Sequence, residues 1–303
     1  TPTQLQGLSS ASISGLTATQ FAALTATQMA SLTAAQVAGI NETQIAALTA
    51  TQQRALTATQ LAGLNLTAVE ALRPDQLAAL TITQIRGLGS AALSQLTVTQ
   101  LSALSTTQLA ALTTTQIRGL GSADVSELTV TMLGALTATQ IAALSATGAQ
   151  GLTEEQLAAL TTTQMRALGS AAIGALSETQ LAALVLGVLP SLSATAIAGP
   201  SPVQIAALTP TQLAVLSTTQ VAALTVTQLR TLSETQAASL AATQIARLTA
   251  AQIGALSGTA VAALGTEQLA VLSATQIRGL AGTAVSALTA TQMAALTATQ
   301  FAA

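Results

Sequence analysis

The side chains that could do chemistry in this 303-residue chain are carboxylates, guanidiniums, hydroxyls and amides, because Cys, His, Lys, Tyr and Trp are all absent. Their absence removes thiol and imidazole catalysis, Schiff-base lysines and the commonest zinc ligands. The paired carboxylates Glu154 and Glu155 are explained by the first turn of a helix, where the helix dipole favours negative charge. We therefore predict that the protein is not an enzyme and has no catalytic residue, cofactor site or metal site.

Charge and aromatic content limit the partners of the chain in the same way. Eight Arg and ten acidic residues give a net charge of −2, and Phe21 and Phe301 are the only aromatic residues. Such a surface has neither the basic field nor the stacking platforms that nucleic-acid binding uses. No apolar run approaches the roughly 18–20 residues of a membrane span. We predict no nucleic-acid partner, no membrane insertion and no small-molecule substrate.

An eight-residue unit, Leu-Thr-x-Thr-Gln-(Ile/Leu)-Ala-Ala, positions these side chains and keeps its frame along the whole chain. Between residues 8 and 296, 35 of the 37 octads begin with Leu, and the exceptions are Ile40 and Pro200. A fixed short period indicates one supersecondary unit stacked repeatedly. We predict a single continuous solenoid over residues 1–303, with an irregular segment at about 184–203. The first residues already follow the repeat, so we expect a mature chain or a window of a longer array.

The octad carries the signals of a helix start. Position 2 is Thr, Ser, Asn or Gly and position 5 is usually Gln, which together form a capping box. Pro2, Pro74, Pro202 and Pro210 fall at position 3 and most acidic residues at positions 3 and 4, the first helical turn. A helix is therefore expected from position 3 to about position 1 of the next octad. The predicted structural caps are Thr17, Gln20, Thr25, Gln28, Thr49, Thr153 and Gln156.

Stacking must stabilise these helices, because a helix of this length is unstable alone. The residues at position 6 and at position 1 of the next octad are three apart, so they share one face and form the buried stripe. The predicted core includes Leu16, Phe21, Leu24, Leu80, Ile85, Leu112 and Ile117.

The charges show a second period, from which we predict the size of a coil. Seven of the eight Arg lie in octads whose first residue number is a multiple of sixteen, and eight of the ten acidic residues lie in the alternate octads. We therefore predict an all-α repeat solenoid in which two octads form one 16-residue coil. The alternative is a β-solenoid with 16-residue coils, because Thr-x-Thr suits strands, whereas the abundant Ala, Leu and Gln favour helices.

Acidic residues and Arg also recur eleven residues apart. We interpret these pairs as charges that face each other between coils or between neighbouring fibres. They are Asp75 with Arg86, Glu155 with Arg166, and Glu267 with Arg278.

Three non-enzymatic functions fit this sequence. The first is a structural protein of an extracellular filament, with other copies of itself as partner, assembled by end-to-end or lateral stacking; the lack of Cys favours the extracellular location. The second is an ice-binding protein with Thr-x-Thr arrays, which requires a flat β face. The third is an adhesin or protein-binding scaffold, a role that usually needs a varied, charged or aromatic face.

Overall fold

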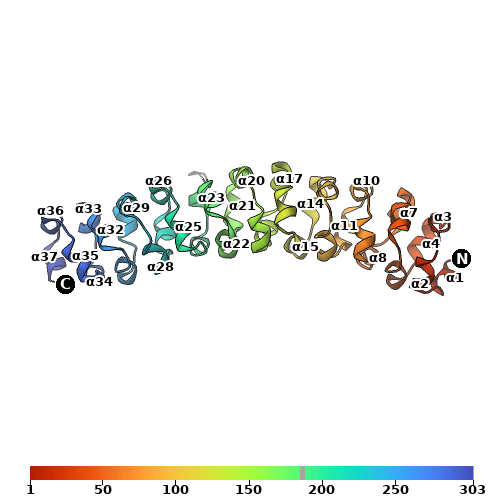
Figure 1. The fold of residues 1–303 in the computed structure, drawn as a ribbon, viewed down its shortest axis with the longest axis horizontal. Helices are drawn as coiled ribbons and strands as arrows, with labels where there is room; N and C mark the ends of the chain where they lie inside the picture. The colour runs from red at the N-terminus through yellow and green to blue at the C-terminus, as the bar shows by residue number, and fades with distance from the viewer. Residues whose placement is uncertain (185–187, 303) are drawn as a thin grey trace. The chain divides into compact units, whose positions relative to one another are not determined.

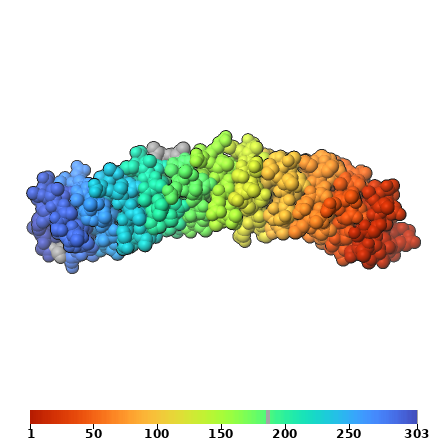
Figure 2. Space-filling view, in the orientation of Figure 1, coloured from red at the N-terminus to blue at the C-terminus, as the bar shows by residue number. Residues whose placement is uncertain are grey.

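The computed structural model describes residues 1–184 and 188–302, and in these residues it contains helices and no strand. The prediction of an all-α repeat solenoid is confirmed, and the β-solenoid alternative is wrong for the described residues. The chain falls into two compact units, Thr1–Gly151 and Leu152–Ala303. Within each unit the short helices follow one another in chain order (Figure 1), and their side chains form a continuous surface (Figure 2).

The helices of the first unit are α1 Pro2–Gln6, α2 Ser10–Ser14, α3 Ala18–Ala22, α4 Ala26–Ser31, α5 Ala34–Val37, α6 Glu42–Ala46, α7 Ala50–Ala55, α8 Ala58–Ala62, α9 Leu66–Glu70, α10 Pro74–Ala78, α11 Ile82–Gly87, α12 Ser90–Leu93, α13 Val98–Ser102, α14 Thr106–Ala111, α15 Thr114–Gly119, α16 Ser122–Ser126, α17 Val130–Gly134, α18 Ala138–Ala142 and α19 Ala146–Gln150. Those of the second unit are α20 Glu154–Ala159, α21 Thr162–Ala167, α22 Ser170–Ala175, α23 Glu178–Ala182, the 3-10 helix η1 Leu189–Ser191, α24 Ala194–Ile197, α25 Pro202–Ala206, α26 Pro210–Ala214, α27 Thr218–Ala222, α28 Val226–Leu229, α29 Glu234–Ser239, α30 Ala242–Ile245, α31 Ala250–Ile253, α32 Gly258–Ala262, α33 Thr266–Ala270, α34 Ala274–Gly279, α35 Gly282–Ser286, α36 Ala290–Ala294 and α37 Ala298–Phe301.

Each corner between helices is made by the Leu at position 1 and the cap at position 2. At one such corner Leu32 has φ −63° and ψ 138°, and Thr33 has φ −74° and ψ 159°. Both are ordinary extended conformations, and no described residue has a positive φ. The chain therefore turns without glycine, because two extended residues separate one helix from the next.

One coil contains three helices, so the prediction of a 16-residue coil is wrong. In the first unit α1 packs on α4, α2 on α5 and α3 on α6, and in the second unit α25 packs on α28 and α26 on α29. Three octads therefore form one 24-residue coil. The charge pattern misled the prediction because it does not follow the walls of the solenoid: Arg54, Arg86 and Arg118 lie on α7, α11 and α15, which belong to three different stacks of helices.

The core is the stripe formed by positions 6 and 1. Phe21, Ile85 and Ile117 are fully buried, and Leu80 and Leu112 are nearly so. Leu16 and Leu24, also predicted as core, are only partly buried, since they belong to the first coil, against which no earlier coil packs.

The second unit contains the segment 184–203, of which residues 185–187 lie outside the described residues. Here η1 takes the place of an α-helix in the stacking order. As a result α21 packs on η1 and α22 on α24, and the three-helix coil continues.

Candidate stacking site between coils

The glutamine at position 5 connects each helix to its own cap and to the preceding coil. Gln84 accepts a hydrogen bond at its Oε1 from the backbone N–H of Thr81, at 3.0 Å. Its Nε2 donates to the carbonyls of Gln53 and Leu56, at 2.8 and 2.9 Å. One buried amide therefore completes the capping box and joins two coils.

The same contact recurs with a fixed register. Gln116 donates to the carbonyls of Ile85 and Leu88 at 2.8 and 2.6 Å, and Gln220 to those of Leu189 and Leu192 at 2.9 and 2.8 Å. In each case the two acceptors precede the glutamine by the same two spacings, |i−j| of 31 and 28. Leu88 and Leu192 follow a helix, and their carbonyls accept no other backbone hydrogen bond. The carbonyls of Ile85 and Leu189 also accept from the N–H of Leu88 and Leu192, both at 3.1 Å. Among the described residues no buried side-chain nitrogen or oxygen is left without a partner.

The predicted caps all lie at helix starts. The Thr17 hydroxyl accepts from the Gln20 N–H at 3.2 Å, Thr25 from Gln28 at 3.3 Å, Thr49 from Gln52 at 3.3 Å and Thr153 from Gln156 at 3.1 Å. In the reverse direction Gln20, Gln28 and Gln156 accept at Oε1 from the N–H of their cap residues. Sequence reasoning missed the second use of the position-5 amides, the donation from Nε2 that Gln84, Gln116 and Gln220 make.

Small residues bring the helices of adjacent coils into backbone contact. A Cβ placed on Gly87 would lie 2.4 Å from the Ala58 carbonyl oxygen, and one on Gly39 would lie 2.2 Å from that of Ser10. In both pairs the glycine at position 8 meets the residue 29 positions earlier. A side chain at these glycines would push the coils apart, because contacts under 3.0 Å are not tolerated.

The charged pairs predicted at a spacing of eleven do not meet within the chain. Asp75 forms an ion pair with Arg73 at 3.0 Å, the one ion pair in the part of the chain that the structure describes. The hydrogen bond from Arg73 lowers the pKa of the Asp75 carboxyl. Arg86 instead donates from Nε to the Ala111 carbonyl at 2.9 Å. A spacing of eleven is less than half of a 24-residue coil, so the paired residues lie on different walls.

The other four predicted charges, Glu155, Arg166, Glu267 and Arg278, likewise have no ion-pair partner in residues 1–184 and 188–302. Their pairing between neighbouring fibres stays a prediction.

Asp124 replaces the glutamine at position 5 of its octad. Its Oδ2 accepts from the Gly121 N–H at 2.8 Å, which reproduces the reach back to the cap. A carboxylate has no N–H for the carbonyls of Leu93 and Leu96, which occupy the register of the acceptors. Burial raises the pKa of the Asp124 carboxyl, and the hydrogen bond from Gly121 opposes that shift.

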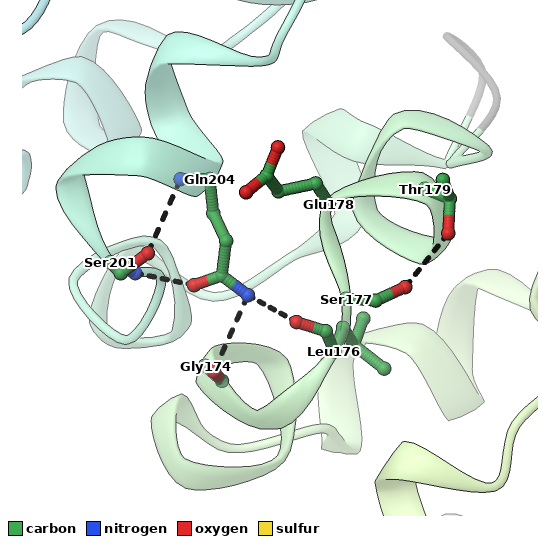
Figure 3. A pocket seen from close by; sticks show the side chains of 7 residues that line it. All are labelled: Gly174, Leu176, Ser177, Glu178, Thr179, Ser201 and Gln204. Atoms are coloured by element: carbon green, nitrogen blue, oxygen red, sulfur yellow. Dashed lines mark hydrogen bonds between the residues drawn. The ribbon is translucent and has the colours of Figure 1, made fainter.

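An open hollow of about 570 Å³ lies beside one of the stacking contacts (Figure 3). Its lining residues are Gly174, Leu176, Ser177, Glu178, Thr179, Ser201 and Gln204. Gln204 donates to the Leu176 carbonyl, and the hydroxyls of Ser177 and Thr179 are 2.9 Å apart. Glu178 is the one charged residue of this lining, so the hollow offers hydroxyl and amide hydrogen-bonding groups and a single carboxylate.

Metal ligands and membrane-spanning helices are the other two features that the sequence predicts to be absent. No group of three or more Asp and Glu is close enough to hold a metal ion in the described chain. None of the helices in the described ranges has the length and apolar character required to span a membrane.

Comparison with known proteins supports the repeat architecture. A family profile named the ALTTAQ repeat matches residues 154–185 and 201–234, which contain helices α20–α23 and α25–α28. No curated protein matches the chain in sequence. Over these two segments the chain is similar to ALTTAQ repeats, and it is a repeat protein whose short-helix solenoid is compatible with a structural or scaffold role.

Proposed function

We propose that the chain is a structural protein, a subunit or segment of an extracellular filament that grows by stacking solenoid coils. The observation that carries the proposal is the repeated use of one contact, from glutamine Nε2 to two carbonyls of the preceding coil in a constant register. When every coil binds its neighbour in the same way, coils can be added without a new interface.

The composition supports a mechanical task. The exposed residues are mainly Thr, Ser and Ala with few charges, and Phe301 is the one exposed aromatic residue among the described residues. Recognition of a protein partner typically uses aromatic and Arg anchors, and these are scarce here. A role outside the cell and without catalysis agrees with a chain that has no Cys or His.

A coil that no neighbour covers has exposed apolar groups that favour assembly. Leu8 in the first coil is 37% exposed and Phe301 in the last is 57% exposed, whereas Leu208 and Leu216 in the interior are 4% and 3% exposed. Such surface is present wherever an array stops, and burial against another coil removes it from water at about 25 cal/mol per Å².

The test is the state of the purified 303-residue chain at increasing concentration. We expect sedimentation velocity to show growing species, and negative-stain electron microscopy to show particles whose length increases while their width stays that of one solenoid. A chain that remains monomeric at millimolar concentration would contradict the filament proposal.

Of the two alternatives, the structure leaves support for one. Ice binding depended on a flat β face, but Thr17 and Thr19 lie at a helix start, so the Thr-x-Thr motif does not form a strand ladder. A flank-binding scaffold is the second candidate, because hollows between coils carry single charges, such as Glu178 in one and Arg86 in another. A partner bound at the first hollow would be released by Glu178→Lys, without any change in filament length.

A further inference from the structure

We infer that a hollow on the flank of the first unit binds a sugar acid, a ligand that combines one carboxylate with several hydroxyl groups. The inference goes beyond the filament proposal, because it assigns a ligand to the solenoid itself and not to its assembly. The hollow has a volume of about 340 Å³ and lies where α14 turns into α15, against the start of α18. Sites for small molecules have volumes of about 300–1,000 Å³, so this one holds a ligand of modest size.

A hydrogen bond between two coils holds the guanidinium of Arg86 at this hollow. Its Nε donates to the carbonyl of Ala111 at 2.9 Å, from the last turn of α11 to the end of α14. Nη1 and Nη2 make no hydrogen bond within residues 1–184 and 188–302, and Arg86 has no ion-pair partner there. The N–H groups of a planar guanidinium match the two oxygens of a carboxylate. The free end of Arg86 is therefore suited to bind a carboxylate.

The charge of the hollow favours a carboxylate over a phosphate. Arg86 is the one charged residue of the lining, so the hollow carries a single positive charge. A carboxylate neutralises this charge. A phosphate monoester has about 1.5 to 2 negative charges at pH 7, and the excess would stay without a cation beside it.

The threonine hydroxyls of the hollow specify the remainder of the ligand. Thr113 and Thr137 are helix caps, and each hydroxyl already donates to the Oε1 of the glutamine three residues later, at 3.1 and 3.0 Å. Thr114 and Thr139 are exposed, and their hydroxyls make no hydrogen bond in the described part of the chain. A free hydroxyl donates one hydrogen bond and accepts two, so groups that also do both are its best partners. Ligand hydroxyls beside the carboxylate meet this requirement.

Arg118 is a matched control for Arg86. Both arginines occupy position 7 of an octad, and both are exposed. Arg118 makes no hydrogen bond or ion pair among the described residues. At the repeat position that corresponds to Thr114, the chain next to Arg118 has Ala146 and so lacks the hydroxyl. A cation alone is thus present at Arg118, whereas Arg86 combines a cation that is held in place with free hydroxyls.

Calorimetric titration of the full chain with sodium glucuronate at constant ionic strength measures the affinity. Glucose lacks the carboxylate and sodium acetate lacks the hydroxyls, so we expect both to bind at least about tenfold more weakly than glucuronate. Selective ¹⁵N labelling of arginine locates the site, because the chain has only eight Arg. The Nε signal of Arg86 should shift with glucuronate, while that of Arg118 stays in place. The inference is overturned if glucuronate does not bind, or if glucose or acetate binds as tightly.

Variants separate the guanidinium from the hydroxyls. Arg86→Gln should weaken glucuronate binding about tenfold or more, and Arg118→Gln should leave it unchanged. Thr114→Ala and Thr139→Ala should each weaken it about two- to tenfold. Alanine occupies the same octad positions in α18 and α5, so both variants should fold normally. An equal loss in Arg86→Gln and Arg118→Gln, or no loss in either threonine variant, would contradict the assigned site.

The same variants keep this inference separate from the filament proposal. Particle length by negative-stain electron microscopy should be unchanged in Arg86→Gln and Thr114→Ala, because neither side chain takes part in a glutamine contact between coils. Filaments that form without glucuronate binding would overturn the ligand site alone. Binding by a chain that forms no filaments would overturn the filament proposal alone.

Discussion

Residues 201–256 and 120–151 build the same coil with different stacking contacts. Each of the seven octads in the first stretch has glutamine at position 5, whereas in the second Gln140 is the only one of four. Asp124, Met132 and Gly148 occupy position 5 in the other three octads, and each of these octads still forms a helix of ordinary length. Glutamine is therefore not needed to start a helix or to set the size of the coil, and its special contribution is the bond between coils.

The cost of losing the glutamine is visible in the preceding coil. The carbonyls of Leu96 and Leu104 accept no hydrogen bond in the described part of the chain, because Asp124 and Met132 have no amide to offer. Another octad solves the problem differently: Ala68 stands in place of glutamine, and the cap Asn65 donates from Nδ2 to the Ile40 carbonyl at 2.9 Å. Residues 120–151 have no such replacement, so we expect this stretch to be less stable than 201–256.

The largest expected effect comes from giving residues 201–256 the methionine that stands in place of a glutamine in residues 120–151. Gln236→Met removes the donor to the carbonyls of Ala206 and Leu208 and the acceptor of the Ser233 N–H. The Leu208 carbonyl would be left unpaired in a buried site and the other two groups at a partly buried one, so the free energy of unfolding should fall by about 3 kcal/mol. Urea denaturation followed by circular dichroism measures it. Since Met132 already shows that methionine fits this position, a change under about 0.5 kcal/mol would mean that the amide contributes little.

The reverse exchange, from methionine to glutamine, should stabilise residues 120–151. Met132→Gln supplies a donor for the carbonyls of Leu101 and Leu104 and an acceptor for the Thr129 N–H. We expect a gain of about 1.5 kcal/mol in the same urea experiment. Hydrogen exchange should show slower exchange of the Thr129 amide in the variant. A loss of stability would indicate that the two stretches differ in packing and not in hydrogen bonding.

Asp124→Gln should give a gain of about 1 kcal/mol at neutral pH, and its size should depend on pH. Burial raises the pKa of Asp124 in the folded chain, so the folded state binds the proton more tightly than the unfolded state. The natural chain therefore loses stability as pH rises through that raised pKa, and it regains it as pH falls toward the ordinary value of 3.8. The advantage of Asp124→Gln over the natural chain should shrink in acid. An advantage that is constant between neutral pH and pH 4 would exclude the charge as its cause.

The smallest expected effect concerns a helix cap alone. Gly89 begins α12 without a side-chain cap, and a Cβ there would meet no atom within 4 Å. Gly89→Ser should add a hydroxyl acceptor for the Ala92 N–H and raise the free energy of unfolding by about 0.5 kcal/mol. Gly89→Ala is the control and should bring no gain. If Gly89→Ser raised the free energy of unfolding as much as Met132→Gln does, a cap would stabilise the chain as much as a bond between coils, which would contradict our comparison.

Local chemistry made the helices predictable from the sequence. Proline at positions such as Pro74 and Pro210, and acidic residues such as Glu42, mark a first helical turn whatever lies around it. The size of the coil could not be predicted in this way, because the charges are exposed and no charge pairing ties one wall to the next. A better signal for the size of the coil is the spacing of small residues. Gly39, Gly87 and Gly119 each have a Ser or Ala 29 positions earlier in the sequence, and each contacts that residue.

The stacking role of glutamine also left a signal. A capping box works with glutamate as well as with glutamine, yet no octad has glutamate at position 5. Only glutamine has both the oxygen that the cap needs and the N–H that the preceding coil accepts. The exclusive use of glutamine instead of glutamate at position 5 thus indicates a contact with another coil. It does not indicate which coil supplies the acceptors.

The backward reach of the amides bears on how such a chain is made. Gln44 binds the carbonyls of Ile13 and Leu16, and Gln252 binds that of Leu224, so each glutamine finds partners that precede it in the sequence. During synthesis from the N-terminus, those carbonyls leave the ribosome before the glutamine that binds them does. Each new coil can then dock on a finished one without waiting for the remainder of the chain, and folding can keep pace with translation.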